Sequence, residues 1–174
     1  MGIFASPSDC FLSWIDEQSP QNTLDALNDF ESYLAEAGPF EGLIAFSQAA
    51  GFAASLMIRK LREGGGTHAL LSPPFQCAIF FCSAPLVGDS VFGRYLDPVV
   101  DKHRIQIPTA HIWGRNDHQV QGTGSWLAEL CASDATEVYV HEDGHEIPGN
   151  RKPDAVRGAL RVMRKTIDRA TFAC

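Results

Sequence analysis

The sequence predicts an α/β fold with a mostly parallel sheet and helices on both faces of that sheet. Short apolar runs of strand length alternate along the chain with longer amphipathic segments of helix length, which is the order of repeated βαβ units. One run, at residues 77–82, is apolar at every position, as expected of a strand covered on both faces. The 174 residues are 45% hydrophobic and long enough to bury one core, so we expect a single domain over residues 1–174.

The first half of the chain supplies two helices and two strands. The segment 23–37 repeats Leu or Phe at helical spacing and meets Gly38-Pro39, a common helix end. The run 41–46 has the length and composition of a buried strand. It leads through Ser47 into the alanine-rich segment 48–63, which suits a helix packed closely on a sheet. The next strand is the apolar run already described.

The second half repeats the pattern. We expect strands at 107–114 and 136–141, with a helix at 123–132 between them. The last segment begins at Pro153, a residue favoured in the first turn of a helix. Its apolar positions share one helical face: Val156, Leu160, Met163 and Ile167. Four strands and their helices are therefore expected to build one sheet with two covered faces.

Composition excludes several classes of function. A net charge of −7, with no cluster of Lys or Arg beyond short pairs, leaves no basic surface for nucleic acid. No apolar stretch reaches the roughly 20 residues of a membrane span, and the N-terminus lacks a signal-peptide pattern, so we expect a cytoplasmic protein. Five cysteines without a CxxC pair and six histidines without ligand spacing predict neither a disulfide framework nor a metal site. We also expect no cofactor.

Polar residues that directly follow the expected strands carry the functional signal. Functional groups of open parallel sheets gather at the carboxyl ends of the strands, and there the chain places Ser47, Asp117 and His145, each after a different strand. Their order along the chain and their placement match a serine nucleophile deprotonated by a histidine that an acid orients. Rival assignments stay open: Asp143 as the acid, His118 as the base, and Ser47 as a helix N-cap.

Three blocks of the sequence resemble the signature blocks of the FSH-type serine hydrolases, a family of the α/β-hydrolase superfamily with many fungal members. They are GPFEGLIAFSQAAGFAASL at residues 38–56, IPTAHIWGRNDHQV at 107–120 and VYVHEDGHEIPG at 138–149. The resemblance implies acyl transfer to water, with Ser47 as nucleophile, Asp117 as acid, His145 as base and the Gln48 amide in the oxyanion hole. It implies an esterase or thioesterase whose substrate is a small acyl ester or thioester, as in fungal polyketide or other secondary metabolism.

Two departures from the family pattern shape these expectations. Ala45 and Ala49 stand where the family has glycines, a small change because a methyl group is the least intrusion into the serine turn. The first strands of the family precede a segment found here at 13–16. We therefore expect a truncated α/β-hydrolase fold that lacks those strands and the loop that supplies a second oxyanion amide. An open edge at Gly42–Phe46 would follow, covered by a second copy, by the N-terminal segment or by a partner protein.

A second function stays open beside the hydrolase. A member without hydrolytic activity would keep the fold as a binding or scaffolding subunit, or use the former hydrolase pocket as an isomerase or cyclase. For the substrate we predict contacts with Phe92 and Tyr95, in a segment at 86–100 with the composition of a lid, and with Ile147, close after His145. A helix packed on the sheet is the alternative interpretation of that segment.

Overall fold

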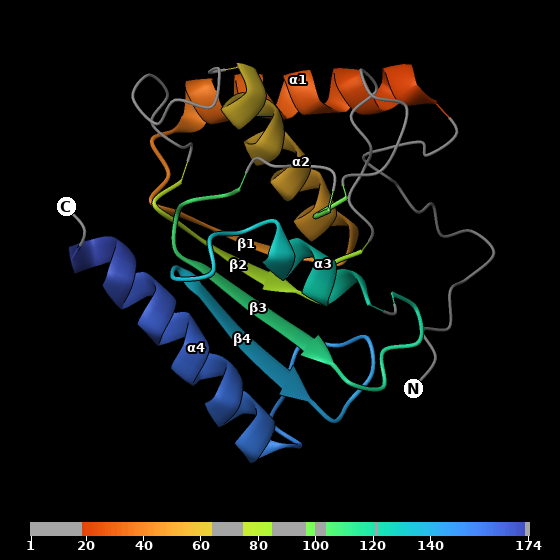
Figure 1. The fold of residues 1–174 in the computed structure, drawn as a ribbon, viewed down its shortest axis with the longest axis vertical. Helices are drawn as coiled ribbons and strands as arrows, with labels where there is room; N and C mark the ends of the chain where they lie inside the picture. Colours follow the sequence, from red (N-terminus) through yellow and green to blue (C-terminus); the bar gives the residue numbers. More distant parts are fainter. Residues whose placement is uncertain (1–18, 64–74, 85–96, 100–103, 121, 173–174) are drawn as a thin grey trace.

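A parallel sheet of four strands in the order β1-β2-β3-β4 forms the centre of the structure (Figure 1). The computed structural model describes residues 19–63, 75–84, 97–99, 104–120 and 122–172. Each strand after the first pairs in parallel with the strand that precedes it in the chain. The elements are α1 (Pro20–Ala37), β1 (Gly42–Phe46), α2 (Gln48–Glu63), β2 (Cys77–Phe81), β3 (Thr109–Gly114), α3 (Thr123–Glu129), β4 (Thr136–His141) and α4 (Pro153–Phe172).

The types of element and their order are those expected from the sequence, with small changes at their ends. The third strand begins at Thr109 rather than at 107, and α4 continues to Phe172. Helix α3 ends at Glu129 rather than at 132. Its last turn tightens because Leu130 N bonds to Leu127 O as well as to Trp126 O, a common way for a helix to stop.

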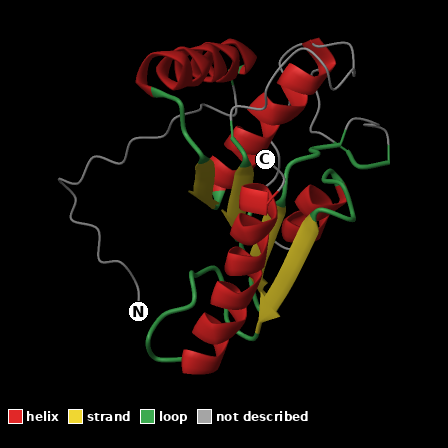
Figure 2. Ribbon diagram, turned by 90° about the vertical axis from the view of Figure 1, so that its left-hand side faces the viewer, coloured by secondary structure: helices red, strands yellow, loops and turns green. Residues whose placement is uncertain are grey.

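Alternate side chains of β2 face opposite layers of helices. Ala78 and Phe80 belong to a core cluster that includes side chains of α2 and α3. Ile79 and Phe81 belong to a second cluster with side chains of α4, the helix that passes in front of the strands in Figure 2. All five residues of β2 are buried, as a strand between two helical layers requires. The predicted α/β fold with helices on both faces is confirmed.

Small side chains let α2 lie close to the sheet, and α1 packs on α2 in turn. Residues 50–58 of α2 are buried throughout. The ring centroids of Phe30 in α1 and Phe52 in α2 lie 5.7 Å apart. At the start of α1 the Ser19 side chain accepts a hydrogen bond from Asn22 N, the N-cap arrangement that serine favours. No helix in the described ranges is long and apolar enough to cross a membrane.

Strand β1 is an edge strand, and one of its faces is open. It pairs with β2, and the described part of the chain places no strand on its other side. Ile44 is in register with Ile79 of β2, yet Ile44 is 64% exposed while Ile79 is 2% exposed. Phe46, on the same face of β1, is 37% exposed. Within the described ranges the edge at Gly42–Phe46 is therefore unpaired, and its cover by a second copy, by the N-terminal segment or by a partner protein stays a prediction.

Substitutions of Ile44 and Ile79 test whether the face of β1 that carries Ile44 is exposed to water. We expect Ile79→Ala to lower the free energy of unfolding by about 2–5 kcal/mol, the usual cost of truncating a buried isoleucine. Ile44→Ala should cost about 1 kcal/mol or less, because most of that side chain already meets water. Urea unfolding of both variants gives the comparison. Equal costs would contradict an open face and indicate that a further surface covers Ile44.

His111 is a core residue of β3. It is 1% exposed, its Nε2 lies 3.1 Å from Thr109 Oγ1, and its ring centroid lies 5.3 Å from that of Phe80. Burial lowers the pKa of His111 from 6.5 to about 3, because the apolar surroundings disfavour the charged imidazolium. The ring is therefore neutral in the folded protein at neutral pH.

The lowered pKa of His111 makes stability depend on pH. Below about pH 6.5 the unfolded chain binds a proton at this residue that the folded protein does not bind until pH approaches 3. The free energy of unfolding should therefore decrease as the pH is lowered from about 6.5 towards 3. This one group contributes up to about 1.4 kcal/mol per pH unit. We expect His111→Gln to flatten the pH dependence of the free energy of unfolding, measured by urea unfolding, and a variant that keeps the pH dependence of the wild type would contradict the lowered pKa of His111.

Candidate active site

Ser47 lies in a tight turn between β1 and α2. Its φ angle is 55°, in the left-handed region that residues with a side chain rarely adopt, and holding it there costs on the order of 1–3 kcal/mol. Ser47 N donates to Phe81 O at 2.9 Å, and Ser47 O accepts from Ala50 N and Ala84 N at 3.1 Å each. These bonds hold a strained strand-to-helix turn of the kind that presents a nucleophilic serine.

The Ser47 hydroxyl, the His145 imidazole and the Asp117 carboxylate form one continuous line of hydrogen bonds. His145 Nε2 lies 2.8 Å from Ser47 Oγ, and His145 Nδ1 lies 2.7 Å from Asp117 Oδ2. The other carboxylate oxygen, Oδ1, accepts from the amides of Gln119 and Val120 at 3.0 and 3.3 Å. Because an ionised carboxylate only accepts hydrogen bonds, it places the imidazole proton on Nδ1 and leaves Nε2 to accept from the serine.

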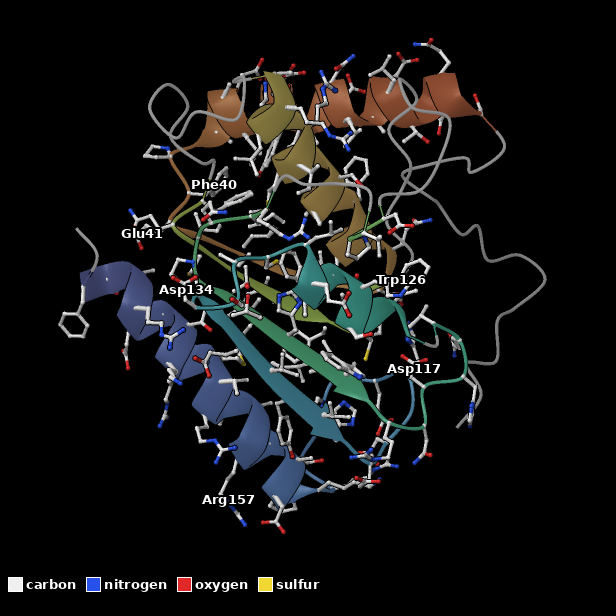
Figure 3. The ribbon with its side chains drawn as sticks, in the orientation of Figure 1. Phe40, Glu41, Asp117, Trp126, Asp134 and Arg157 are labelled. Carbon is white, nitrogen blue, oxygen red and sulfur yellow. The ribbon has the colours of Figure 1, made fainter. Side chains whose placement is uncertain are left out.

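The acid and the base are almost fully shielded from water. The Asp117 side chain is 4% exposed and the His145 side chain 9%. Asp117 lies just beyond the carboxyl end of β3 (Figure 3). A carboxylate and an imidazolium attract each other more strongly in such surroundings than at the protein surface. The arrangement therefore strengthens the electrostatic interaction between Asp117 and His145 whenever the imidazole is charged.

Backbone contacts hold the loop of the acid against the loop of the base. Arg115 N donates to His141 O at 2.6 Å, and Asn116 N donates to Asp143 O at 3.0 Å. The Asn116 side chain adds a bond from Nδ2 to Glu142 O at 2.6 Å. Arg115 and Glu142 form an exposed ion pair at 3.0 Å. Since three of these four contacts use the backbone, the distance between the two loops depends little on the side chains that form their surface.

The rival residues lie elsewhere. Asp143 Oδ2 is 3.5 Å from His141 Nδ1, and Asp143 Oδ1 contacts the Lys152 ammonium group, so this carboxylate faces away from His145. Burial lowers the pKa of His141, which favours a neutral ring there. His118 is exposed. The structure thus brings Asp117 to His145, and it brings the hydroxyl of Ser47 to His145 as well.

The sequence matches the model of one protein family, described as Serine hydrolase (FSH1), over residues 5–155. The chain belongs to the FSH1 serine hydrolase family. Among its relatives, Esterase FPY3 of Fusarium mangiferae is 34% identical over 167 aligned residues, which cover 92% of this chain and 72% of that protein. Family of serine hydrolases 2 of Saccharomyces cerevisiae is 29% identical, over 80% of this chain and 62% of that protein. The FSH1-family chain therefore spans 62% to 72% of the length of these two relatives.

Solved structures share the fold of this FSH1-family chain. A carboxylesterase of Bacillus cereus superposes with a TM-score of 0.50 at 15% identity, over 82% of this chain and 62% of that one. A structure of YahD with malic acid superposes with a TM-score of 0.53 at 19% identity, over 87% of this chain and 65% of that one. At such identities the likeness concerns the fold alone, and it agrees with the predicted α/β-hydrolase fold.

The other predicted site residues of the FSH1-family chain have different outcomes. Gln48 is the first residue of α2 and directly follows Ser47. Ile147 is 50% exposed in the loop that carries His145. Phe92 and Tyr95 lie outside the described residues, as does most of the segment with the composition of a lid. The roles of Gln48, Ile147, Phe92 and Tyr95 stay predictions.

Two further residues contact the base or the acid and were not expected from the sequence. The ring centroid of Phe46 lies 4.9 Å from that of His145. Donor atoms of Cys82, Asp117 and His145 lie within 4.8 Å of one another. Both residues adjoin strand ends, the same signal that identified Ser47 and Asp117. Their apolar or weakly polar side chains were assigned to the core instead.

Gly114, the last residue of β3, lies close against the backbone of the loop that leads to His145. A Cβ atom at Gly114 would lie 2.1 Å from Asp143 O and 2.3 Å from Gly144 O, and backbone atoms cannot yield as a flexible side chain can. Gly114→Ala should therefore push the loop of the base away and lower the free energy of unfolding by about 1–3 kcal/mol. Gly149→Ala, where no atom lies within 4 Å of the new Cβ, should change it by about 0.5 kcal/mol or less.

Two measurements check this prediction for Gly114. Urea unfolding gives the change in stability, and proton NMR detects the deshielded, far-downfield proton of the hydrogen bond between His145 and Asp117. We expect the signal to be lost or weakened in Gly114→Ala and kept in Gly149→Ala. A Gly114→Ala protein with both the stability and the signal of the wild type would contradict the close approach.

Proposed function

We propose that this FSH1-family protein is a serine hydrolase that cleaves a small carboxylic ester or thioester through an acyl-enzyme on Ser47. The observation that carries the proposal is the unbroken line of hydrogen bonds from Ser47 Oγ through His145 to Asp117. An esterase among the relatives, at 34% identity, supports an ester as the substrate.

In the proposed acylation step, Ser47 Oγ attacks the carbonyl carbon of the substrate. The hydroxyl proton passes to His145 Nε2, and the imidazolium formed is stabilised by Asp117 through the bond at Nδ1. The negative charge that develops on the carbonyl oxygen meets the amide of Gln48 at the start of α2, where the helix dipole also favours an anion. The bond to the leaving group then breaks, and the alcohol or thiol departs with the proton from Nε2.

In the proposed deacylation step, water replaces the departed group. His145 Nε2 takes a proton from the water as its oxygen attacks the carbonyl of the acyl-Ser47 ester. The bond between the carbonyl carbon and Ser47 Oγ breaks, the proton returns to Ser47 Oγ, and a carboxylic acid is released. Both steps use the same tautomer of His145, because Asp117 accepts from Nδ1 throughout.

The substrate is proposed only as a chemical class. The exposed, apolar Phe46 packs against the ring of the proposed base, and the exposed Ile147 follows that base by two residues in the chain, which supports a substrate with an apolar part. The resemblance to fungal members that act on polyketides supports a substrate from polyketide or other secondary metabolism. A natural substrate of this class would have to be presented as an ester or thioester whose carbonyl reaches the Ser47 turn.

Labelling with a fluorophosphonate probe tests the proposal, because the probe bonds covalently to an activated serine. We expect the wild-type protein to be labelled and Ser47→Ala to remain unlabelled. His145→Gln should lower the labelling rate by about 10²–10⁴-fold, since it removes the general base. Ser125→Ala, which removes a hydroxyl bonded to Gly122 O in α3, is the matched control and should label at the wild-type rate.

Two other results would contradict the proposed hydrolase function. Labelling that persists in Ser47→Ala would place the reactive group elsewhere. A folded wild-type protein that does not label and hydrolyses no activated ester would instead support the second function, a binding or scaffolding subunit or an isomerase or cyclase on the same fold. Circular dichroism of each variant distinguishes a lost activity from a lost fold.

A further inference from the structure

Cys82, directly after β2, is in a strained backbone conformation. Its φ angle is 43°, and in the described part of the chain only Ser47 shares a positive φ among residues other than glycine. Such a conformation costs on the order of 1–3 kcal/mol for a residue with a side chain, and it persists only where its surroundings enforce it. The two strained residues follow neighbouring, paired strands, so the strain is concentrated at the end of the sheet that carries the site.

The backbone around Cys82 connects the turn of the serine to the strand of the acid. Cys82 N donates to Ile112 O of β3 at 2.8 Å. On either side of Cys82, Phe81 O accepts from Ser47 N and Ala84 N donates to Ser47 O, at 2.9 and 3.1 Å. One short segment, residues 81–84, therefore holds the Ser47 turn and is itself fixed to the strand that leads to Asp117.

The side chain of Cys82 reaches the acid and the loop of the base. Its Sγ donates to Glu146 O at 3.5 Å, and Glu146 is the neighbour of His145 in the chain. Its Sγ, an oxygen of Asp117 and a nitrogen of His145 lie within 4.8 Å of one another. The residue is 1% exposed. The thiol thus occupies buried space beside the hydrogen bond that joins Asp117 to His145.

The Cys82 thiol is an uncharged group beside the Asp117 carboxylate. Burial raises the pKa of Cys82, and the charge of Asp117 raises it further, because a thiolate would be a second negative charge beside the carboxylate. The group therefore stays an S–H at neutral pH and is a poor nucleophile. It fills space next to the carboxylate and adds no charge that would compete with the imidazolium of His145.

We propose that Cys82 is a positioning residue of this site, whose thiol holds the Asp117 carboxylate and the loop of His145 at hydrogen-bond distance from each other. The inference rests on the proposed hydrolase, since it assigns Cys82 a role in the reaction of Ser47. Without the thiol, the acid and the loop of the base gain room to move, and misplacement by a fraction of an ångström is enough to slow a proton transfer.

The test compares Cys82→Ala and Cys82→Ser with a control at the other end of the same strand. Cys77→Ala removes a buried thiol from the first residue of β2, so it measures the cost of losing a core cysteine away from the site. The rate of fluorophosphonate labelling is measured for each protein from pH 5 to pH 9. Proton NMR of the same samples follows the deshielded, far-downfield proton between His145 and Asp117, a signal that exists without turnover.

We expect Cys82→Ala to label about tenfold more slowly than Cys77→Ala or slower still, with the acid limb of its pH profile displaced and the NMR signal weakened. Cys82→Ser keeps a hydroxyl donor for Glu146 O and should recover most of the rate and the signal. Should Cys82→Ala not fold, Cys82→Gly, which relieves the positive φ, removes the same thiol for the same comparison.

Equality of the Cys82 and Cys77 variants in rate, in pH profile and in the NMR signal would overturn the inference. A change in melting temperature with an unchanged pH profile and signal would also overturn it, because it would show a role in packing alone. Failure of the proposed hydrolase is separate, since it appears as a wild-type protein without labelling. In that case the NMR comparison still decides whether Cys82 positions the pair of Asp117 and His145.

Discussion

The simultaneous hydrogen bonds at both ring nitrogens of His145 are the interaction on which the site depends. Nδ1 bonds to Asp117 and Nε2 to Ser47, at 2.7 and 2.8 Å, so an error in the position of the ring is felt at both ends. The ring belongs to a loop, and its position is determined by what the loop is attached to. The backbone bonds from Arg115 and Asn116 to that loop supply the attachment, and the absence of a side chain at Gly114 makes it sterically feasible.

The end of β2 has a comparable function for the serine. Phe81 and Ala84 bond to the backbone of Ser47, and Cys82 between them bonds to β3. The strain at Ser47 is thus opposed by bonds from the segment at the end of β2 as well as by bonds from the first turn of α2. Two rigid attachments result, one between β3 and β4 for the acid and the base, and one between β1 and β2 for the nucleophile. The pairing of β2 with β3 fixes their relative position.

Much of this arrangement could be predicted from the sequence, because hydrophobic period and strand ends carry the information. The four strands were recognised as apolar runs, and the parallel order follows from their alternation with helices. Ser47, Asp117 and His145 could be found because each is a polar residue immediately after such a run. The sequence predicts that both alanines of the serine turn are small because the turn is crowded; in the structure Ala45 is buried and Ala49 is exposed, so only the strand side is crowded.

The remaining features depend on geometry that one sequence does not express. The positive φ of Cys82 arises from the surroundings of the β2 end, and nothing in the letters of that run distinguishes Cys82 from a core residue. Which of Asp117 and Asp143 contacts His145 depends on the direction in which each loop turns its carboxylate. The Asp143 carboxylate is instead paired with His141 and Lys152. The exposure of Ile44 likewise follows from how far α4 extends across the sheet rather than from the composition of β1.

The hydrogen bond between Ser47 and His145 joins residues that are far apart in the chain and that follow opposite edges of the described sheet. The two residues are 98 positions apart in the chain, and they follow β1 and β4, the two edges of the described sheet, about 14 Å apart at the usual strand spacing. The acid and base, only 28 positions apart, belong to adjacent strands and need far less of the chain to be ordered. The line of hydrogen bonds from Ser47 to Asp117 therefore depends on the order of the whole described sheet, so that under the proposed function a covalent serine probe would also report complete folding.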